Sequence, residues 1–117
     1  MKLRFRKNSL RLRLNQREAA ALASGEELEE RVDFPEGSAL VYRLVPGNSP
    51  DPGAQFSAGV ITVSLPAATA QSWQQSADIG VYYRTGSLDV AIEKDLECTD
   101  LREEEQDPFA YPRKTKC

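Results

Sequence analysis

The chain has 117 residues, 40% of them hydrophobic and 28% charged, with a net charge of −3. This size predicts a single globular domain that buries roughly 60% or more of its unfolded surface. The sequence contains no histidine, which argues against triad hydrolases and common zinc sites. It also contains neither a secretory signal nor a run of about eighteen apolar residues, so we predict a cytoplasmic protein.

The first fourteen residues alternate between apolar and basic side chains, as expected of a strand with one buried face. Leu3 and Phe5 are predicted to face the core in the first half of this stretch, and Leu10, Leu12 and Leu14 in the second. The outward positions are basic: Lys2, Arg4, Arg6, Arg11 and Arg13. The inward parity changes across residues 7–9, which predicts a turn or a bulge there.

A short helix is predicted after this stretch. Asn15 followed by Glu18 is a capping-box pattern, and Gly25 can adopt the left-handed conformation that ends a helix. The predicted inner face consists of Ala19, Leu22 and Ala23.

A hairpin is predicted next. Its inward residues are Leu28, Val32 and Phe34 before the turn at 35–37, and Leu40, Tyr42 and Leu44 after it. Residues 46–53, PGNSPDPG, are rich in turn formers, so we interpret them as a connector that cannot belong to a central strand.

The second half predicts the same order of elements. Residues 60–65 form a strand, and Pro66 suits the first turn of a helix with Ala70 and Trp73 inside. A hairpin follows, turning at 85–86, with Ile79, Val81 and Tyr83 inward on one side and Leu88, Val90 and Ile92 inward on the other.

The two halves match at an offset of fifty-one residues, which indicates a duplication. The matched pairs include Phe5 with Phe56, Leu12 with Val63, and Leu22 with Trp73. We therefore predict an α+β fold: a duplicated strand-helix-hairpin unit forming a barrel-like or two-layer antiparallel sheet with two short helices. The predicted single domain, 1–117, contains pseudo-repeats 1–46 and 54–95, a linker at 47–53 and an acidic tail at 96–117.

The acidic tail is expected to dock on the domain. Residues 95–107 carry seven acids and one arginine, whereas residues 1–17 carry seven cations and no acid. Phe109 and Tyr111 are predicted anchors. Cys98 and Cys117 are expected to be free thiols, because no C-x-x-C spacing is present.

The basic stripe has three interpretations. We favour pairing with acids of the same chain, namely the tail and a further group consisting of Glu26, Glu27, Glu29 and Asp33. A foreign protein or a small anion is the second interpretation. Nucleic acid is the third, and it is unlikely because no exposed aromatic residue accompanies the cations.

Glu93, Asp95 and Glu97 recur every second residue and form the strongest candidate for catalysis or for binding Mg²⁺ or Ca²⁺. A solvated strand end explains the same residues, so we predict no metal and no cofactor. Neither nucleotide-binding glycine motif, G-x-G-x-x-G or G-x-x-x-x-G-K-[ST], is present.

The sequence resembles a family of small uncharacterised bacterial proteins. The resemblance rests on N-S-L-R-L-R-L at residues 8–14, on E-K-D-x-x-C at residues 93–98, and on an acidic tail containing Phe and Pro. It implies a cytoplasmic bacterial protein and no particular activity. Should these segments form one site, its candidate residues are Arg11, Arg13, Glu93 and Asp95, with Lys2, Arg4 and Arg6 as candidate anion contacts.

Our first hypothesis is a non-enzymatic interaction module that binds a protein or a second copy of itself. We predict no membrane partner. The alternative is a small-anion binder or an enzyme that uses the four candidate residues, and RNA binding is third. A deep pocket where the four residues converge would favour the alternative, and a flat or self-filled surface the first hypothesis.

Overall fold

The computed structural model describes residues 1–96 and 108–111. Within them, each half of the chain contributes two strands, a helix and two more strands, which confirms the predicted α+β class and the repeated unit. The elements are β1 Lys2–Arg6, β2 Ser9–Leu14, α1 Gln16–Ala23, β3 Leu28–Asp33, β4 Ala39–Gly47, β5 Gly53–Ser57, β6 Val60–Pro66, α2 Ala67–Gln75, β7 Gly80–Thr85 and β8 Leu88–Lys94.

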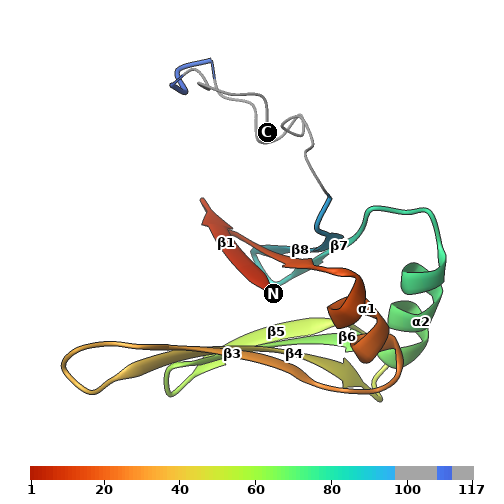
Figure 1. The fold of residues 1–117 in the computed structure, drawn as a ribbon, viewed down its shortest axis with the longest axis horizontal. Coiled ribbons are helices and arrows are strands. Elements are labelled where there is room, and N and C mark those ends of the chain that lie inside the picture. Colours follow the sequence, from red (N-terminus) through yellow and green to blue (C-terminus); the bar gives the residue numbers. More distant parts are fainter. Residues whose placement is uncertain (97–107, 112–117) are drawn as a thin grey trace.

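The strands form two four-stranded sheets that lie as separate layers (Figure 1). The first sheet has the order β1-β2-β8-β7, and the second has the order β3-β4-β6-β5. The two-layer arrangement is therefore found, and the sheets do not close into a barrel within the described residues.

The sheets are mixed, which corrects the expectation of antiparallel sheets. The outer strand pairs are antiparallel, but the central pairs β2 with β8 and β4 with β6 are parallel. Each repeat contributes its first hairpin to one sheet and its second hairpin to the other, and the helix forms the crossover. Strands from different repeats consequently meet side by side at the centre of each sheet.

The backbone supports the duplication in detail. Lys7 and Ala58, fifty-one residues apart, occupy the turns after β1 and β5, and both have a φ of 52°. The helices begin at Gln16 and Ala67, which are also fifty-one residues apart. Exchanging the two repeats therefore converts one sheet into the other.

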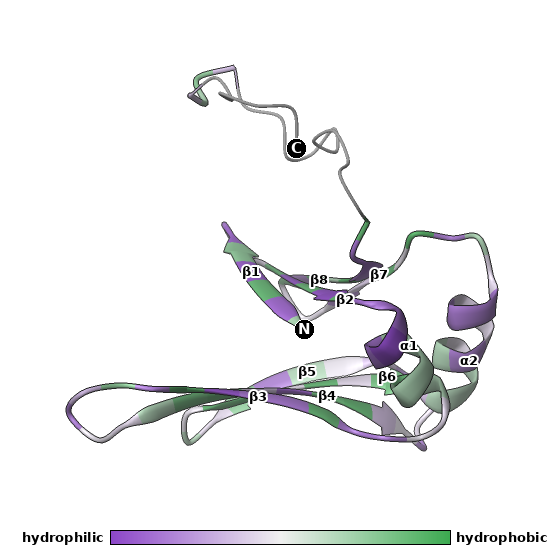
Figure 2. Ribbon diagram, in the orientation of Figure 1, coloured by the Kyte–Doolittle hydropathy of each residue, from purple (hydrophilic) through white to green (hydrophobic). Residues whose placement is uncertain are grey.

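The core lies between the two sheets and under the helices, which cover one end of the layers (Figure 1). Its fully buried side chains come from both repeats, because the inward rows of the central strands face each other; they include Leu12, Leu14, Leu44, Val63, Leu65 and Ile92. β1 alternates between hydrophilic and hydrophobic residues along its length (Figure 2). In β2 and β6 every second residue is buried, so alternation predicted the inward rows of these two strands correctly.

Several residues predicted to be inward are exposed. Phe5 is 57% exposed, and Val32, Phe34 and Ile79 are also exposed. Val32 and Phe34 lie at the turn end of the β3–β4 hairpin, and Ile79 precedes β7. Alternation along a strand identifies a face, but it does not say how far the opposing sheet extends over that face.

The connector is shorter than predicted. β4 is a central strand and continues through Pro46 and Gly47, which pair with Leu65 and Pro66 of β6. The proline lies at the end of the strand, next to a parallel neighbour, where one missing N–H donor is tolerated.

Both predicted helices are present. The Asn15 side chain accepts a hydrogen bond from the Glu18 N–H at 2.8 Å, and the Glu18 carboxylate accepts one from the Asn15 N–H at 2.9 Å. This confirms the capping box. α2 has no such side-chain cap, because Pro66 occupies the position before it.

The predicted docking of the tail stays a prediction. Residues 97–107 and 112–117, which include Glu97, Cys98 and Cys117, lie outside the described residues. In the described segment 108–111, Phe109 and Tyr111 are almost fully exposed.

Tyr83 of β7 links the two sheets. Its hydroxyl donates to the Gly53 carbonyl at 2.9 Å and lies 3.4 Å from the Ser64 carbonyl. Burial raises the pKa of Tyr83 to about 12, whereas an unfolded tyrosine titrates near 10.

This pKa predicts a loss of stability at alkaline pH. Because the unfolded chain releases the phenolic proton first, the contribution is complete below about pH 10 and disappears as pH approaches about 12. Between these pH values the free energy of unfolding is expected to fall by roughly 1 kcal/mol more in the unmodified protein than in a Tyr83→Phe variant. The expected difference is no larger because Tyr83 is only partly buried. Urea unfolding at several pH values measures this difference. If the free energy of unfolding changed with pH to the same extent in both proteins, the prediction would be wrong.

Candidate functional site

The basic residues of β1 and β2 lie on the outer side of the first sheet, which is the side opposite the core. Strand register places them in rows: Lys2 beside Arg13 and Glu93, and Arg4 beside Arg11 and Ala91. We call Lys2, Arg4, Arg6, Arg11 and Arg13 the cationic face. Lys2, Arg4 and Arg6 are exposed, and the side chains of Arg11 and Arg13 are mostly buried.

A buried carboxylate lies in the middle of this face. Glu93 of β8 is 0% exposed. Its Oε1 lies 3.3 Å from Nε of Arg11 and 3.6 Å from Nε of Arg13. Its Oε2 accepts a hydrogen bond from the Tyr82 hydroxyl at 2.6 Å. A buried carboxylate requires such partners, because the charged form loses its hydration.

Gly80 makes room for this arrangement. It is the register partner of Glu93 in β7. A Cβ atom at Gly80 would lie 2.8 Å from the Tyr82 hydroxyl and 2.9 Å from Cγ of Glu93. The Tyr82 side chain can therefore cover Glu93 only because residue 80 is a glycine. Sequence reasoning missed both residues, since only the register of β7 against β8 brings them beside Glu93.

The four predicted site residues come together only in part. Arg11, Arg13 and Glu93 meet, whereas Oδ2 of Asp95 lies 2.7 Å from Nζ of Lys2. Asp95 follows the end of β8, and its N–H donates to the Leu14 carbonyl at 2.8 Å. Lys2 pairs with Asp95, and Glu93 lies between Arg11 and Arg13, so these groups contact one another instead of lining an open cavity and the surface is self-filled.

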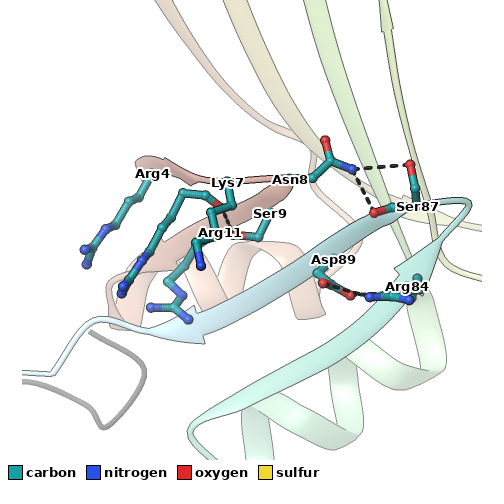
Figure 3. Close-up of a pocket in the computed structure, with 9 residues that line it drawn as sticks. Arg4, Lys7, Asn8, Ser9, Arg11, Arg84, Ser87 and Asp89 are labelled. Atoms are coloured by element: carbon teal, nitrogen blue, oxygen red, sulfur yellow. Dashed lines mark hydrogen bonds and ion pairs between the residues drawn. The ribbon is translucent and has the colours of Figure 1, made fainter. Parts of the chain in front are cut away.

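A shallow hollow of about 470 Å³ lies beside this cluster. Figure 3 shows that Arg4 and Arg11 point to the same side of the sheet there. Asn8 donates to the Ser87 carbonyl at 2.7 Å and so joins the turns at that end. The lining is Arg4, Arg6, Lys7, Asn8, Ser9, Arg11, Arg84, Ser87 and Asp89.

Arg84 and Asp89, which both line the hollow, form an ion pair with each other. Nε of Arg84 lies 2.9 Å from Oδ1 of Asp89, and its Nη2 lies 3.2 Å from Oδ2. These hydrogen bonds lower the pKa of Asp89. Arg84 is consequently committed to its own strand pair.

The acids near β3 do not serve as partners of the cationic face. Glu27 and Glu29 lie 2.7 Å and 3.3 Å from Arg43, and Asp33 lies 2.8 Å from Arg31. This corrects our expectation for Glu27, Glu29 and Asp33, whereas the pairing of Glu26 stays a prediction. β3 belongs to the second sheet, whereas the cationic face belongs to the first.

The duplication shows that the fold does not require the cations. β5 pairs with β6 as β1 pairs with β2, so each outward position of the first sheet has a counterpart in the second. The counterparts of Lys2, Arg4, Arg6, Lys7, Arg11 and Arg13 are Gly53, Gln55, Ser57, Ala58, Thr62 and Ser64. The counterpart of Glu93 is Val45, because Val45 pairs with Ser64 as Glu93 pairs with Arg13.

In the described part of the chain, no group of three or more acidic or thiol side chains is arranged to hold a metal ion. No helix there is long and apolar enough to cross a membrane, and the cytoplasmic location stays a prediction.

Comparison with protein-family models finds a match to a family of unknown function that covers residues 1–114. Comparison with curated proteins and with solved structures finds no match.

Proposed function

This chain belongs to the family of unknown function DUF7009, and because that family prescribes no activity, we propose from the geometry that it is a non-enzymatic interaction module. Its cationic face binds an acidic polypeptide segment. The observation that supports this most strongly is the contrast between the two sheets: the five cations of the cationic face correspond to five neutral residues on the second sheet.

The shape of the face also supports a macromolecular partner. Arg4 and Arg6 are exposed on an edge strand, where an extended peptide can run along them. The self-filled cluster around Glu93 supports this function over the small-anion or enzymatic alternative. The carboxylate that an enzyme would use as a base is enclosed by Arg11, Arg13 and Tyr82.

The test is binding of fluorescein-labelled deca-glutamate to the full chain, followed by fluorescence anisotropy at low ionic strength. Replacing Arg4 by Gln and Arg6 by Ser installs the residues that the second sheet carries. Loss of two charge-assisted contacts is expected to weaken binding roughly tenfold. Added salt is expected to weaken the binding of the unmodified protein, because exposed charges are screened.

The duplication provides a matched control. Replacing Gln55 and Ser57 by Glu lowers the net charge by the same two units, but at the equivalent positions of the second sheet. This variant is expected to keep its affinity within about twofold. Equal losses in the two variants would show that only overall charge matters and would overturn the proposal. Tighter binding of labelled polyuridylate than of deca-glutamate would overturn it in favour of RNA.

A further inference from the structure

β1 lies at one edge of the first sheet. It pairs with β2 on one side, and no strand of the described residues pairs with its other side. In an antiparallel pair, alternate residues direct their N–H and C=O groups away from the partner strand. Such groups along an edge are the sites where a further strand can add to a sheet.

The two faces of β1 differ in chemistry, as its alternating hydropathy shows (Figure 2). Lys2, Arg4 and Arg6 lie on the outer face of the first sheet, and Leu3 and Phe5 alternate with them on the inner face. A strand added beside β1 would have the same two faces. One row of its side chains would lie next to the cations and the other row next to the apolar residues.

The inner face is apolar at Phe5, and it is incompletely covered there. Phe5 is 57% exposed and lines an apolar cleft of about 450 Å³ with walls from both sheets. Leu10 and Phe56 also line this cleft, and Gln55 is the one polar residue of its lining within the described structure. An apolar side chain beside Phe5 would therefore remove apolar surface from water.

The second sheet has an equivalent edge without the charges. Its edge strand β5 carries Phe56 as the counterpart of Phe5, but Gln55 and Ser57 stand where β1 has arginines. An acidic strand can therefore form ion pairs at β1 that β5 does not offer. The cations also disfavour pairing of β1 with β1 of a second copy, because like charges opposite each other destabilise a strand pair.

We propose that the acidic partner binds as an additional strand beside β1 and that its sequence alternates acidic with apolar residues. This inference rests on the proposed function, because it requires that the cationic face binds an acidic polypeptide. Acids of the partner lie beside Lys2, Arg4 and Arg6. Its apolar residues lie beside Leu3 and Phe5. The five residues of β1 thus specify the pattern acidic-apolar-acidic-apolar-acidic.

The test compares the binding of two peptides of identical composition to the full chain. Glu-Phe-Glu-Phe-Glu has the alternation and is the same in both strand directions, whereas Glu-Glu-Glu-Phe-Phe lacks the alternation. Both peptides have blocked ends and the same fluorescein label, and fluorescence anisotropy measures their binding at low ionic strength. The alternating peptide is expected to bind roughly tenfold more tightly, because only its acids and rings lie on opposite faces of a strand. Equal affinities would overturn the inference.

Backbone methylation of the alternating peptide tests the strand pairing itself. One version carries an N-methyl group on its central glutamate, and another carries it on its first phenylalanine. In a strand pair only one of these two N–H groups faces β1. One version is therefore expected to bind roughly tenfold more weakly, and the other as tightly as the unmodified peptide. Equal affinities of the two versions would show binding through side chains alone, which contradicts strand addition.

Two variants of the protein locate the contact with the rings of the peptide. Phe5→Ser is expected to abolish the preference for the alternating peptide, because the ring that contacts its phenylalanine is lost. Phe56→Ser removes the equivalent exposed ring of the second sheet and is expected to leave the preference unchanged. The inference fails if the preference survives Phe5→Ser, or if Phe56→Ser abolishes it as well.

Deca-glutamate binding separates this inference from the proposed function. If deca-glutamate binds and depends on Arg4 and Arg6 while the two pentapeptides bind equally, only the strand addition is wrong. If neither deca-glutamate nor the alternating peptide loses affinity when Arg4 and Arg6 are replaced, the proposed function is wrong, and this inference with it.

Discussion

Replacing Glu93 by glutamine is expected to lower the free energy of unfolding by about 3 kcal/mol. The substitution preserves shape but removes the negative charge between Arg11 and Arg13. Their side chains are only 17% and 21% exposed, so neither guanidinium group can recover full hydration without leaving the sheet. Urea unfolding followed by the fluorescence of the single tryptophan measures the change.

The second sheet supplies the control for this prediction. A triple variant with Arg11→Thr, Arg13→Ser and Glu93→Val carries the residues found at Thr62, Ser64 and Val45. Its stability is expected to lie within about 1 kcal/mol of the unmodified protein, because replacing a whole buried ion cluster is often close to neutral.

Two results would contradict this account of Glu93. A loss below about 0.5 kcal/mol for Glu93→Gln would mean that the charge is effectively solvated, as in a surface pair. A triple variant as unstable as the single one would mean that the cluster itself stabilises the fold. The first sheet would then need its charges for stability, which would weaken the case for a binding face.

Replacing Trp73 by alanine is expected to lower the free energy of unfolding by about 3 to 5 kcal/mol. Trp73 of α2 is 3% exposed and belongs to the buried core. Its indole N–H donates to the Ile79 carbonyl at 3.3 Å, but that carbonyl also accepts from the Lys94 N–H at 2.8 Å. The lost apolar burial therefore accounts for most of the cost.

A conservative variant separates burial from hydrogen bonding at this position. Trp73→Phe retains an aromatic ring and removes the N–H, so its expected cost is about 1 to 2 kcal/mol. Both variants are measured by far-UV circular dichroism in urea, because Trp73 is the only tryptophan. Equal costs for the two variants would show that the hydrogen bond, not burial, dominates.

The candidate site was predictable only to the level of residue types on a face. Alternation put Arg11 and Arg13 outward and Leu10, Leu12 and Leu14 inward, and the structure agrees. Alternation also drew attention to Glu93. It could not reveal that Glu93 is buried, because that depends on Tyr82 and Gly80 of a strand that approaches from the other side.

Phe5 shows the same limit in the core. Its strand position is inward, but its exposure depends on whether the opposing sheet reaches that far. The opposing wall there contains Phe56, which is itself exposed. A pattern with a period of two describes one strand and carries no information about the extent of its neighbour.

The sequence by itself determined the element types, the duplication at fifty-one residues, the helix cap at Asn15 and the row of cations, because each depends on local conformation or on short-range periodicity. Only the tertiary structure decided that the repeats exchange hairpins, so that β2 pairs with β8 and β4 with β6. That exchange brings Glu93 between Arg11 and Arg13. Pairing between strands distant in the chain depends on which apolar faces can be buried together, and no single segment encodes that choice.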